Sequence, residues 1–109
     1  MALIVREVAL EVVAELRPLM AQIGRKDGDL ERQLRRAASS MVLNIAEGER
    51  SQGGNKRSRY FSAFGSASEV DAAVQLAEAW GYVEGPVTGR VRGRIHRVLR
   101  MLHGLTTRR

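Results

Sequence analysis

Residues 56–81 read KRSRYFSAFGSASEVDAAVQLAEAWG, and this stretch decides the fold because it predicts a helix with two apolar sides. One side recurs at spacings of three and four and consists of Tyr60, Ala63, Phe64, Ala67, Val70, Val74 and Ala77. The other consists of Phe61, Gly65, Ala72, Leu76 and Trp80, displaced by well over a right angle at ~100° per residue. A helix that is apolar on two sides needs two neighbours.

Three more segments of helical periodicity lie outside this one, and short stretches rich in Gly, Asp, Asn or Pro separate them. The predicted helices are about 3–23, 29–47, 56–81 and 86–105. We expect Pro18 to kink or break the first helix, and either Asp27 or Asp29 to cap the second. Gly48 fits the end of the second helix, and Asn55 fits the cap of the third.

The short loops determine how the four helices are arranged, since they leave no room for a long crossover. No segment alternates like a half-buried strand. The prediction is an all-α, antiparallel, up-down-up-down four-helix bundle that forms a single domain over residues 1–109. In the last helix, the core stripe is expected to be Val87, Val91, Ile95, Val98, Leu99 and Leu102.

Positive charge is concentrated at the C-terminal end of the chain. Residues 85–109 contain seven arginines, two histidines and no acidic residue, whereas residues 1–84 contain 11 basic and 12 acidic residues. The whole net charge of +6 therefore comes from the last quarter. Such a field attracts phosphate polymers or acidic protein surfaces. Nucleic acid is the leading class of partner.

Composition excludes several other classes of protein. The chain has no cysteine, which removes disulfides, thiolate catalysis and cysteine-based zinc sites, and fits a reducing compartment such as the cytoplasm. Acidic and basic residues at Arg6, Glu7, Glu11 and Glu15 interrupt the apolar N-terminal stretch, so we expect neither a signal peptide nor a membrane span.

Enzyme chemistry finds little support in the sequence. No Glu-x-x-His pair exists for a di-metal site within a bundle, and no glycine-rich phosphate loop of the Gly-x-x-x-x-Gly-Lys type occurs. His96 and His103 are seven residues apart on one side of the last helix, but that helix has no carboxylate to orient them. We expect two solvent-facing histidines, no catalytic residue, no metal and no cofactor.

An ordered set of short motifs runs through the two middle helices. They are residues 33–40 (QLRRAASS), residues 44–48 (NIAEG), residues 59–61 (RYF), residues 65–70 (GSASEV) and residues 81–82 (GY). This combination resembles a family of bacterial four-helix bundle proteins whose founding members are encoded by intervening sequences inside 23S ribosomal RNA genes. The residues that carry the family motif are Asn44, Glu47, Gly48, Ser66 and Glu69.

This resemblance implies a bundle that assembles into a ring-shaped homo-oligomer, typically a pentamer, with suspected nucleic-acid binding and no established reaction. A related branch comprises the accessory proteins of diversity-generating retroelements, which are associated with a reverse transcriptase and its template RNA. From the residues alone, Asn44 and Glu47 fit either hydrogen bonding near the end of a helix or a binding site at one end of the bundle.

The second apolar side of the third helix favours self-association independently of the resemblance. An exposed apolar patch of that size is one that soluble monomers usually avoid. The alternative is that the same residues pack under a neighbouring helix or loop of their own chain. The expected oligomer interface consists of Leu43, Phe61, Gly65, Ala72, Leu76 and Trp80.

Arginines around the last helix are the predicted nucleic-acid contacts, because their planar donors suit phosphate oxygens. This set consists of Arg90, Arg92, Arg94, Arg97 and Arg100, with a second group of Arg35, Arg36, Arg57 and Arg59. Gly89 and Gly93, four apart on the outward side, indicate either close approach by a helix or phosphate backbone, or a frayed helix start. Few aromatic residues are free to stack on bases, so base-specific reading is not expected.

Two functions from different classes follow. The first is a non-catalytic, homo-oligomeric protein that binds the backbone of RNA or DNA. The second is a structural adaptor whose basic face docks onto a protein partner such as a reverse transcriptase.

Overall fold

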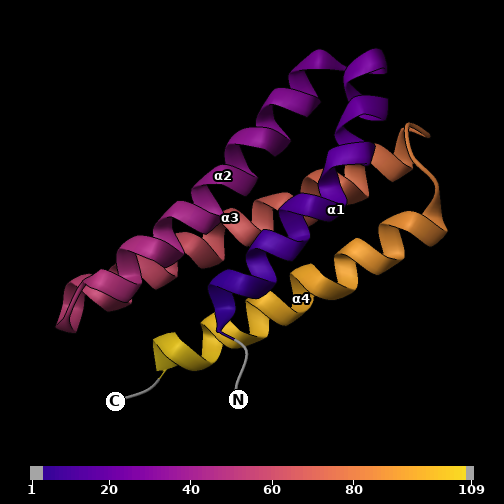
Figure 1. Cartoon of the computed structure of the whole chain (residues 1–109). Helices are drawn as coiled ribbons and strands as arrows, with labels where there is room; N and C mark the ends of the chain where they lie inside the picture. The colour runs from indigo at the N-terminus through magenta and orange to yellow at the C-terminus, as the bar shows by residue number, and fades with distance from the viewer. Residues whose placement is uncertain (1–3, 108–109) are drawn as a thin grey trace.

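The computed structural model describes residues 4–107, and within them the chain forms four α-helices: α1 (Val5–Lys26), α2 (Gly28–Arg50), α3 (Gly53–Ala79) and α4 (Gly85–Thr107). Successive helices run in opposite directions along an elongated body of 43 × 27 × 18 Å (Figure 1). Both α1 and α3 pack against α2 and α4. The predicted all-α four-helix bundle is therefore confirmed. The expected start at Leu3, and Arg108 and Arg109, lie outside the described residues.

One continuous core fills the space between the helices. Its largest fully buried side chains include Leu16, Ile23, Leu34, Met41, Ile45, Ile95 and Leu102. The predicted core stripe was wrong at the start of α4, where Val87 is 38% exposed and the neighbouring Thr88 is buried instead. The Thr88 hydroxyl lies within hydrogen-bonding distance of the Glu78 carboxylate and the Gly85 carbonyl, which offsets the cost of burying it.

A single residue, Asp27, joins α1 to α2 and caps both helices. Its backbone N–H donates to Ile23 O (2.7 Å), and its carboxylate accepts a hydrogen bond from the backbone N–H of Leu30 (3.0 Å). Of the two acidic residues considered as the cap, Asp27 is the one used. The Tyr82 hydroxyl donates to the same carboxylate (3.2 Å), which ties the α3–α4 turn to the α1–α2 turn.

At the α2–α3 turn, two predicted boundaries were wrong. Gly48 does not end α2, which continues to Arg50, and Asn55 does not cap α3, which begins at Gly53 after the N-cap residue Gln52. Gly48 lies buried inside α2 because the ring of Tyr60 packs against it: a Cβ at this position would lie 2.6 Å from Tyr60 Cε1. The glycine is needed for helix contact, not for termination.

The C-terminal end of α3 has the hydrogen bonds of a Schellman motif. Gly81 adopts a positive φ of 80°, its N–H donates to Glu78 O (2.9 Å), and the N–H of Tyr82 donates to Ala77 O (2.9 Å). The ring of Trp80 stacks on that of Tyr82, with centroids 6.5 Å apart. This turn reverses the chain into α4.

Pro18 lies inside α1 without ending the helix. Figure 1 shows the last turns of α1 bending away from the direction of the first, as the loss of a backbone donor and the bulk of the ring lead us to expect. No helix in residues 4–107 is long and apolar enough to cross a membrane.

Candidate nucleic-acid interface

The outward side of α4 is basic and unneutralised. Arg90, Arg97 and Arg100 are exposed, and none of them has an ion-pair partner among residues 4–107. No acidic residue occurs in α4 itself. The opposite side of the helix packs into the core through Val91, Ile95, Val98 and Leu102. This packing fixes the rotation of α4, so that the three arginines face outward.

Glycines lie between the outward arginines. An added Cβ at Gly89, Gly93 or Gly104 would meet no atom of the chain within 4 Å. Nothing in the packing of the bundle therefore requires glycine at these positions, although each glycine in a helix interior costs about 1 kcal/mol relative to alanine. Because α4 is continuous from Gly85 to Thr107, the alternative of a frayed start near Gly89 and Gly93 loses support.

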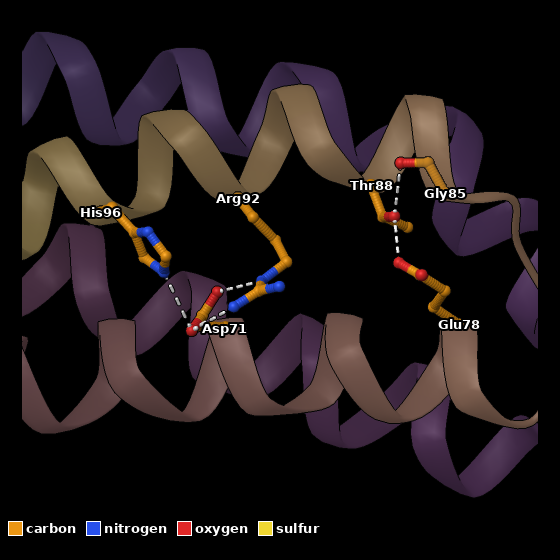
Figure 2. A network of polar contacts seen from close by, with 6 residues as sticks. All are labelled: Asp71, Glu78, Gly85, Thr88, Arg92 and His96. Carbon is orange, nitrogen blue, oxygen red and sulfur yellow. Dashed lines mark hydrogen bonds and ion pairs between the residues drawn. The ribbon is translucent and has the colours of Figure 1, made fainter.

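Arg92 and His96 point toward α3, and both contact the carboxylate of Asp71 (Figure 2). Arg92 Nε donates to Asp71 Oδ1 (2.8 Å), and His96 Nε2 lies 3.2 Å from Asp71 Oδ2. The side chain of Asp71 is 16% exposed and that of Arg92 is 29% exposed. Arg92, which the sequence predicted as a phosphate contact, is therefore engaged in an ion pair between α3 and α4.

The environment of Asp71 favours its charged form. Burial opposes ionisation, but the hydrogen bonds and positive charges of Arg92 and His96 outweigh it and hold the pKa of the carboxyl below its usual range. The same contact raises the pKa of the Arg92 guanidinium. Asp71 therefore stays negative at neutral pH and neutralises part of the charge on α4.

On the opposite flank, α1 supplies two acidic partners to Arg94. Arg94 Nη1 lies 2.8 Å from Glu11 Oε1, and the Arg94 guanidinium also pairs with the Glu15 carboxylate. The five arginines predicted on this helix thus divide into two that bridge to neighbouring helices and three that remain available to a ligand.

The second predicted basic group is not gathered into one site. Arg57 Nε donates to the carbonyl of Thr106 (2.9 Å), which places it beside the C-terminal end of α4. Arg59 Nη1 lies 3.5 Å from Asn44 Oδ1 on α2. Arg35 pairs with Glu31 on the side of α2 that faces α1, while Arg36 is exposed without an ion pair among the described residues. Of these four arginines, only Arg57 has a hydrogen bond to α4 among the described residues.

Motif residues at the α2–α3 contact form a polar network. Asn44 Nδ2 donates to Ser40 O (3.0 Å) and lies 3.1 Å from Ser40 Oγ, which is itself 2.8 Å from Ser66 Oγ on α3. These contacts favour the structural interpretation of Asn44 and Ser66. Glu47 and Glu69 are exposed, and neither carboxylate has an ion-pair partner within residues 4–107.

The residues predicted to mediate self-association lie on the surface of the bundle. Trp80 is 65% exposed, Leu43 63%, Phe61 56% and Leu76 47%. Gly65 and Ala72 are also exposed, and an added Cβ at Gly65 would meet no atom within 4 Å. The alternative in which these side chains pack under another part of their own chain is wrong for the described bundle.

No group of three or more His, Cys, Asp or Glu side chains within residues 4–107 could hold a metal ion. His103 is exposed and His96 is half-exposed. The carboxylate that orients His96 comes from α3, so it could not be found by inspecting the last helix alone. Asp71 is the residue that sequence reasoning missed, and no spacing within one helix signals such a contact between helices.

These features define a class: a small antiparallel four-helix bundle with a basic, acid-free last helix and an apolar outer face. Residues 1–104 match the family model described as 23S rRNA-intervening sequence protein, and the chain belongs to this family. Among solved structures, the chain is similar to a protein of unknown function from the S23 ribosomal protein family of Bacteroides thetaiotaomicron VPI-5482. The two share 17% sequence identity with a TM-score of 0.87, over 96% of this chain and 100% of the other. No curated protein sequence matches the chain.

Proposed function

We propose that this protein is a non-catalytic, homo-oligomeric protein that binds the backbone of RNA or DNA through the outward side of α4. Three exposed arginines that have no acidic partner among residues 4–107, Arg90, Arg97 and Arg100, carry this proposal. Guanidinium groups bind phosphate oxygens with two parallel donors, and such contacts supply affinity without base recognition.

The spacing of these arginines suits an extended anion. Arg90 and Arg97 are two helical turns apart, roughly 10.5 Å along the axis at about 1.5 Å per residue, and Arg100 is one turn further. Gly93 lies between Arg90 and Arg97 on the same side, and Gly104 follows Arg100 by four residues. Without side chains at these positions, a phosphate backbone can approach the helix closely while the arginines reach around it.

Self-association supports the function by repeating the basic surface. Each copy offers only a few phosphate contacts, and several copies on one strand would bind far more tightly than one through their raised effective concentration. The exposed apolar side chains of α3 support an oligomer, because soluble monomers rarely leave such a patch uncovered.

The test compares wild type with Arg90→Gln/Arg97→Gln/Arg100→Gln in titrations against single-stranded RNA, single-stranded DNA and duplexes at several salt concentrations. Each phosphate contact contributes roughly 0.7 to 0.9 to the slope of log K against log salt. We expect the triple variant to lose binding and to flatten this slope by about two to three per engaged copy. A control with the same charge change, Lys26→Gln/Arg32→Gln/Arg50→Gln, changes residues of α1 and α2 only and should bind nearly as wild type.

Salt-independent binding by the wild type, or equal loss in both triple variants, would contradict a specific role for α4. Circular dichroism on both variants shows whether helicity is intact, which exposed substitutions should preserve.

A second candidate is a structural adaptor for a protein partner such as a reverse transcriptase. The exposed Trp80, stacked on Tyr82 at the α3–α4 turn, favours it because tryptophan and tyrosine are common anchors at protein interfaces. A reverse transcriptase gene next to this one would support the adaptor. Binding of the purified reverse transcriptase that is lost in Trp80→Ala, with nucleic-acid binding unchanged, would establish it.

A further inference from the structure

The outer face of α3 carries almost no charge over more than four turns. Between residues 61 and 76, the exposed positions hold one charged residue, Glu69. The rest are apolar, small or uncharged polar side chains: Phe61, Ser62, Gly65, Ser68, Ala72, Gln75 and Leu76. We call this surface, with Glu69, the α3 face. No exposed basic side chain lies on this face to attract phosphate, so the face suits a protein surface better than a nucleic-acid backbone.

A matching surface lies elsewhere on the same bundle, in a hollow of about 530 Å³ between α1 and α2. Its apolar lining comes from Val13, Met20, Ala21 and Ala38. Three arginines also line it, Arg17, Arg25 and Arg35. We call this surface the α1–α2 hollow.

The α1–α2 hollow carries uncompensated positive charge. Arg35 is already paired with Glu31 inside the hollow, with Arg35 Nε 3.0 Å from Glu31 Oε2. Arg17 and Arg25 are exposed and have no ion-pair partner among residues 4–107. Within the described bundle, the hollow therefore offers an apolar lining and two unpaired guanidinium groups, while the α3 face offers apolar side chains and one unpaired carboxylate.

We infer that the α3 face of one copy docks into the α1–α2 hollow of the next, with Glu69 of one copy meeting Arg17 and Arg25 of the other. This inference rests on the homo-oligomer in the proposed function. The occupant is a second copy because one chain carries both complementary surfaces. They lie on different sides of the bundle, since α1 and α3 are each flanked by α2 and α4.

Symmetric pairing of two α3 faces is disfavoured by charge. Glu69 lies at the middle of the face, so a two-fold antiparallel contact would bring the two Glu69 carboxylates together without a counter-charge. Docking into the hollow instead supplies two arginines to one carboxylate. A contact between two different surfaces continues from copy to copy and closes into a ring where the rotation permits.

Head-to-tail docking leaves the nucleic-acid surface open. Neither the α3 face nor the α1–α2 hollow includes a residue of α4, so Arg90, Arg97 and Arg100 of every copy stay accessible. Each added copy then extends the basic surface without covering it.

Charge reversal tests this arrangement by size-exclusion chromatography with light scattering over a range of concentrations. Glu69→Arg alone, and Arg17→Glu/Arg25→Glu alone, should each weaken association by about tenfold or more, as for other desolvated interface charges. All three substitutions in one chain restore opposite charges across every contact and should recover association. The control Lys26→Glu/Arg32→Glu has the same charge change outside the hollow and should associate as wild type.

Cysteine cross-linking gives an independent measurement, because the chain contains no native cysteine. A mixture of Leu76→Cys chains and Ala21→Cys chains, treated with a short bis-maleimide, should yield covalent dimers, whereas each chain alone should not. Cross-linking by Ser68→Cys alone, a position beside Glu69 where a two-fold contact would bring two copies together, would show symmetric pairing and overturn the inference. An oligomer unaffected by Arg17→Glu/Arg25→Glu would overturn it while leaving the proposed function standing. A wild type that is monomeric at all concentrations would overturn the oligomer itself.

Discussion

Arg92 Nε of α4 donates a 2.8 Å hydrogen bond to Asp71 Oδ1 of α3, so an acidic side chain of the bundle holds an arginine of the basic helix. His96 lies 3.2 Å from the other oxygen of the same carboxylate. Stability and nucleic-acid binding should therefore respond in opposite directions when Asp71 is changed.

Asp71→Asn keeps the shape of the side chain and removes its charge. We expect a loss of about 1 to 2 kcal/mol in the free energy of unfolding, toward the lower end because Arg92 is partly exposed. Nucleic-acid affinity should rise, since Arg92 becomes free for phosphate, and the salt dependence should steepen by up to roughly 0.9 per copy. Urea unfolding and binding titrations measure the two effects.

The matched control is Glu84→Gln, which removes an exposed acidic charge that is not in an ion pair within residues 4–107. A similar gain in binding from Glu84→Gln would mean that net charge alone, and not the release of Arg92, sets the affinity.

Acid should destabilise the bundle partly through the same carboxyl. The pKa of Asp71 in the folded chain is below its ordinary value of 3.8, so the unfolded chain binds the proton more readily than the folded one. The contribution of the pair is complete above the ordinary pKa and is lost as pH falls through the folded value. The free energy of unfolding of wild type should therefore decrease below about pH 4 more steeply than that of Asp71→Asn. Parallel curves for the two proteins would show that Asp71 has no part in acid unfolding.

Helix periodicity was sufficient to predict the fold, because every helix buries one stripe and the linkers are short. The errors in helix ends and core positions arise where a residue type fits two different structural roles. Gly48 matches a helix stop, but it is retained inside α2 because the Tyr60 ring occupies the space of its side chain. Val87 fits the stripe of α4 by spacing, yet Thr88 is buried because Glu78 of α3 and Gly85 O provide hydrogen-bond partners for its hydroxyl.

The candidate site was predictable only in outline. The sequence identifies α4 as basic, but it cannot separate Arg92 and Arg94 from Arg97, since the acidic partners come from α3 and α1. Contacts between helices depend on how each helix is rotated and shifted relative to its neighbours. The periodicity within a single helix does not determine this. For the same reason the sequence does not single out Arg17 and Arg25, which come together only because α1 and α2 enclose a hollow.

Gly48→Ala should destabilise the protein although alanine is the better helix former. A Cβ at this position would lie 2.6 Å from Tyr60 Cε1, and the buried ring, covered on one side by Lys56, has little room to move. We expect a loss of about 1 to 3 kcal/mol, typical of overpacking. Thermal unfolding followed by circular dichroism measures it. If Gly48→Ala lowers stability in the Tyr60→Leu background as much as it does in wild type, the clash with the ring is not the cause.

Gly93 tests whether the glycines of α4 serve a ligand. An added Cβ meets nothing within 4 Å, so Gly93→Ala should stabilise the bundle by about 0.5 to 1 kcal/mol. Gly93→Leu should still fold and keep every arginine, but its side chain would lie between Arg90 and Arg97 and hold a phosphate backbone away from the helix. We expect nucleic-acid affinity to fall about fivefold, the equivalent of about 1 kcal/mol. Unchanged affinity in Gly93→Leu would mean that the bound backbone does not approach α4 at this turn, and that the glycine serves neither the fold nor the ligand.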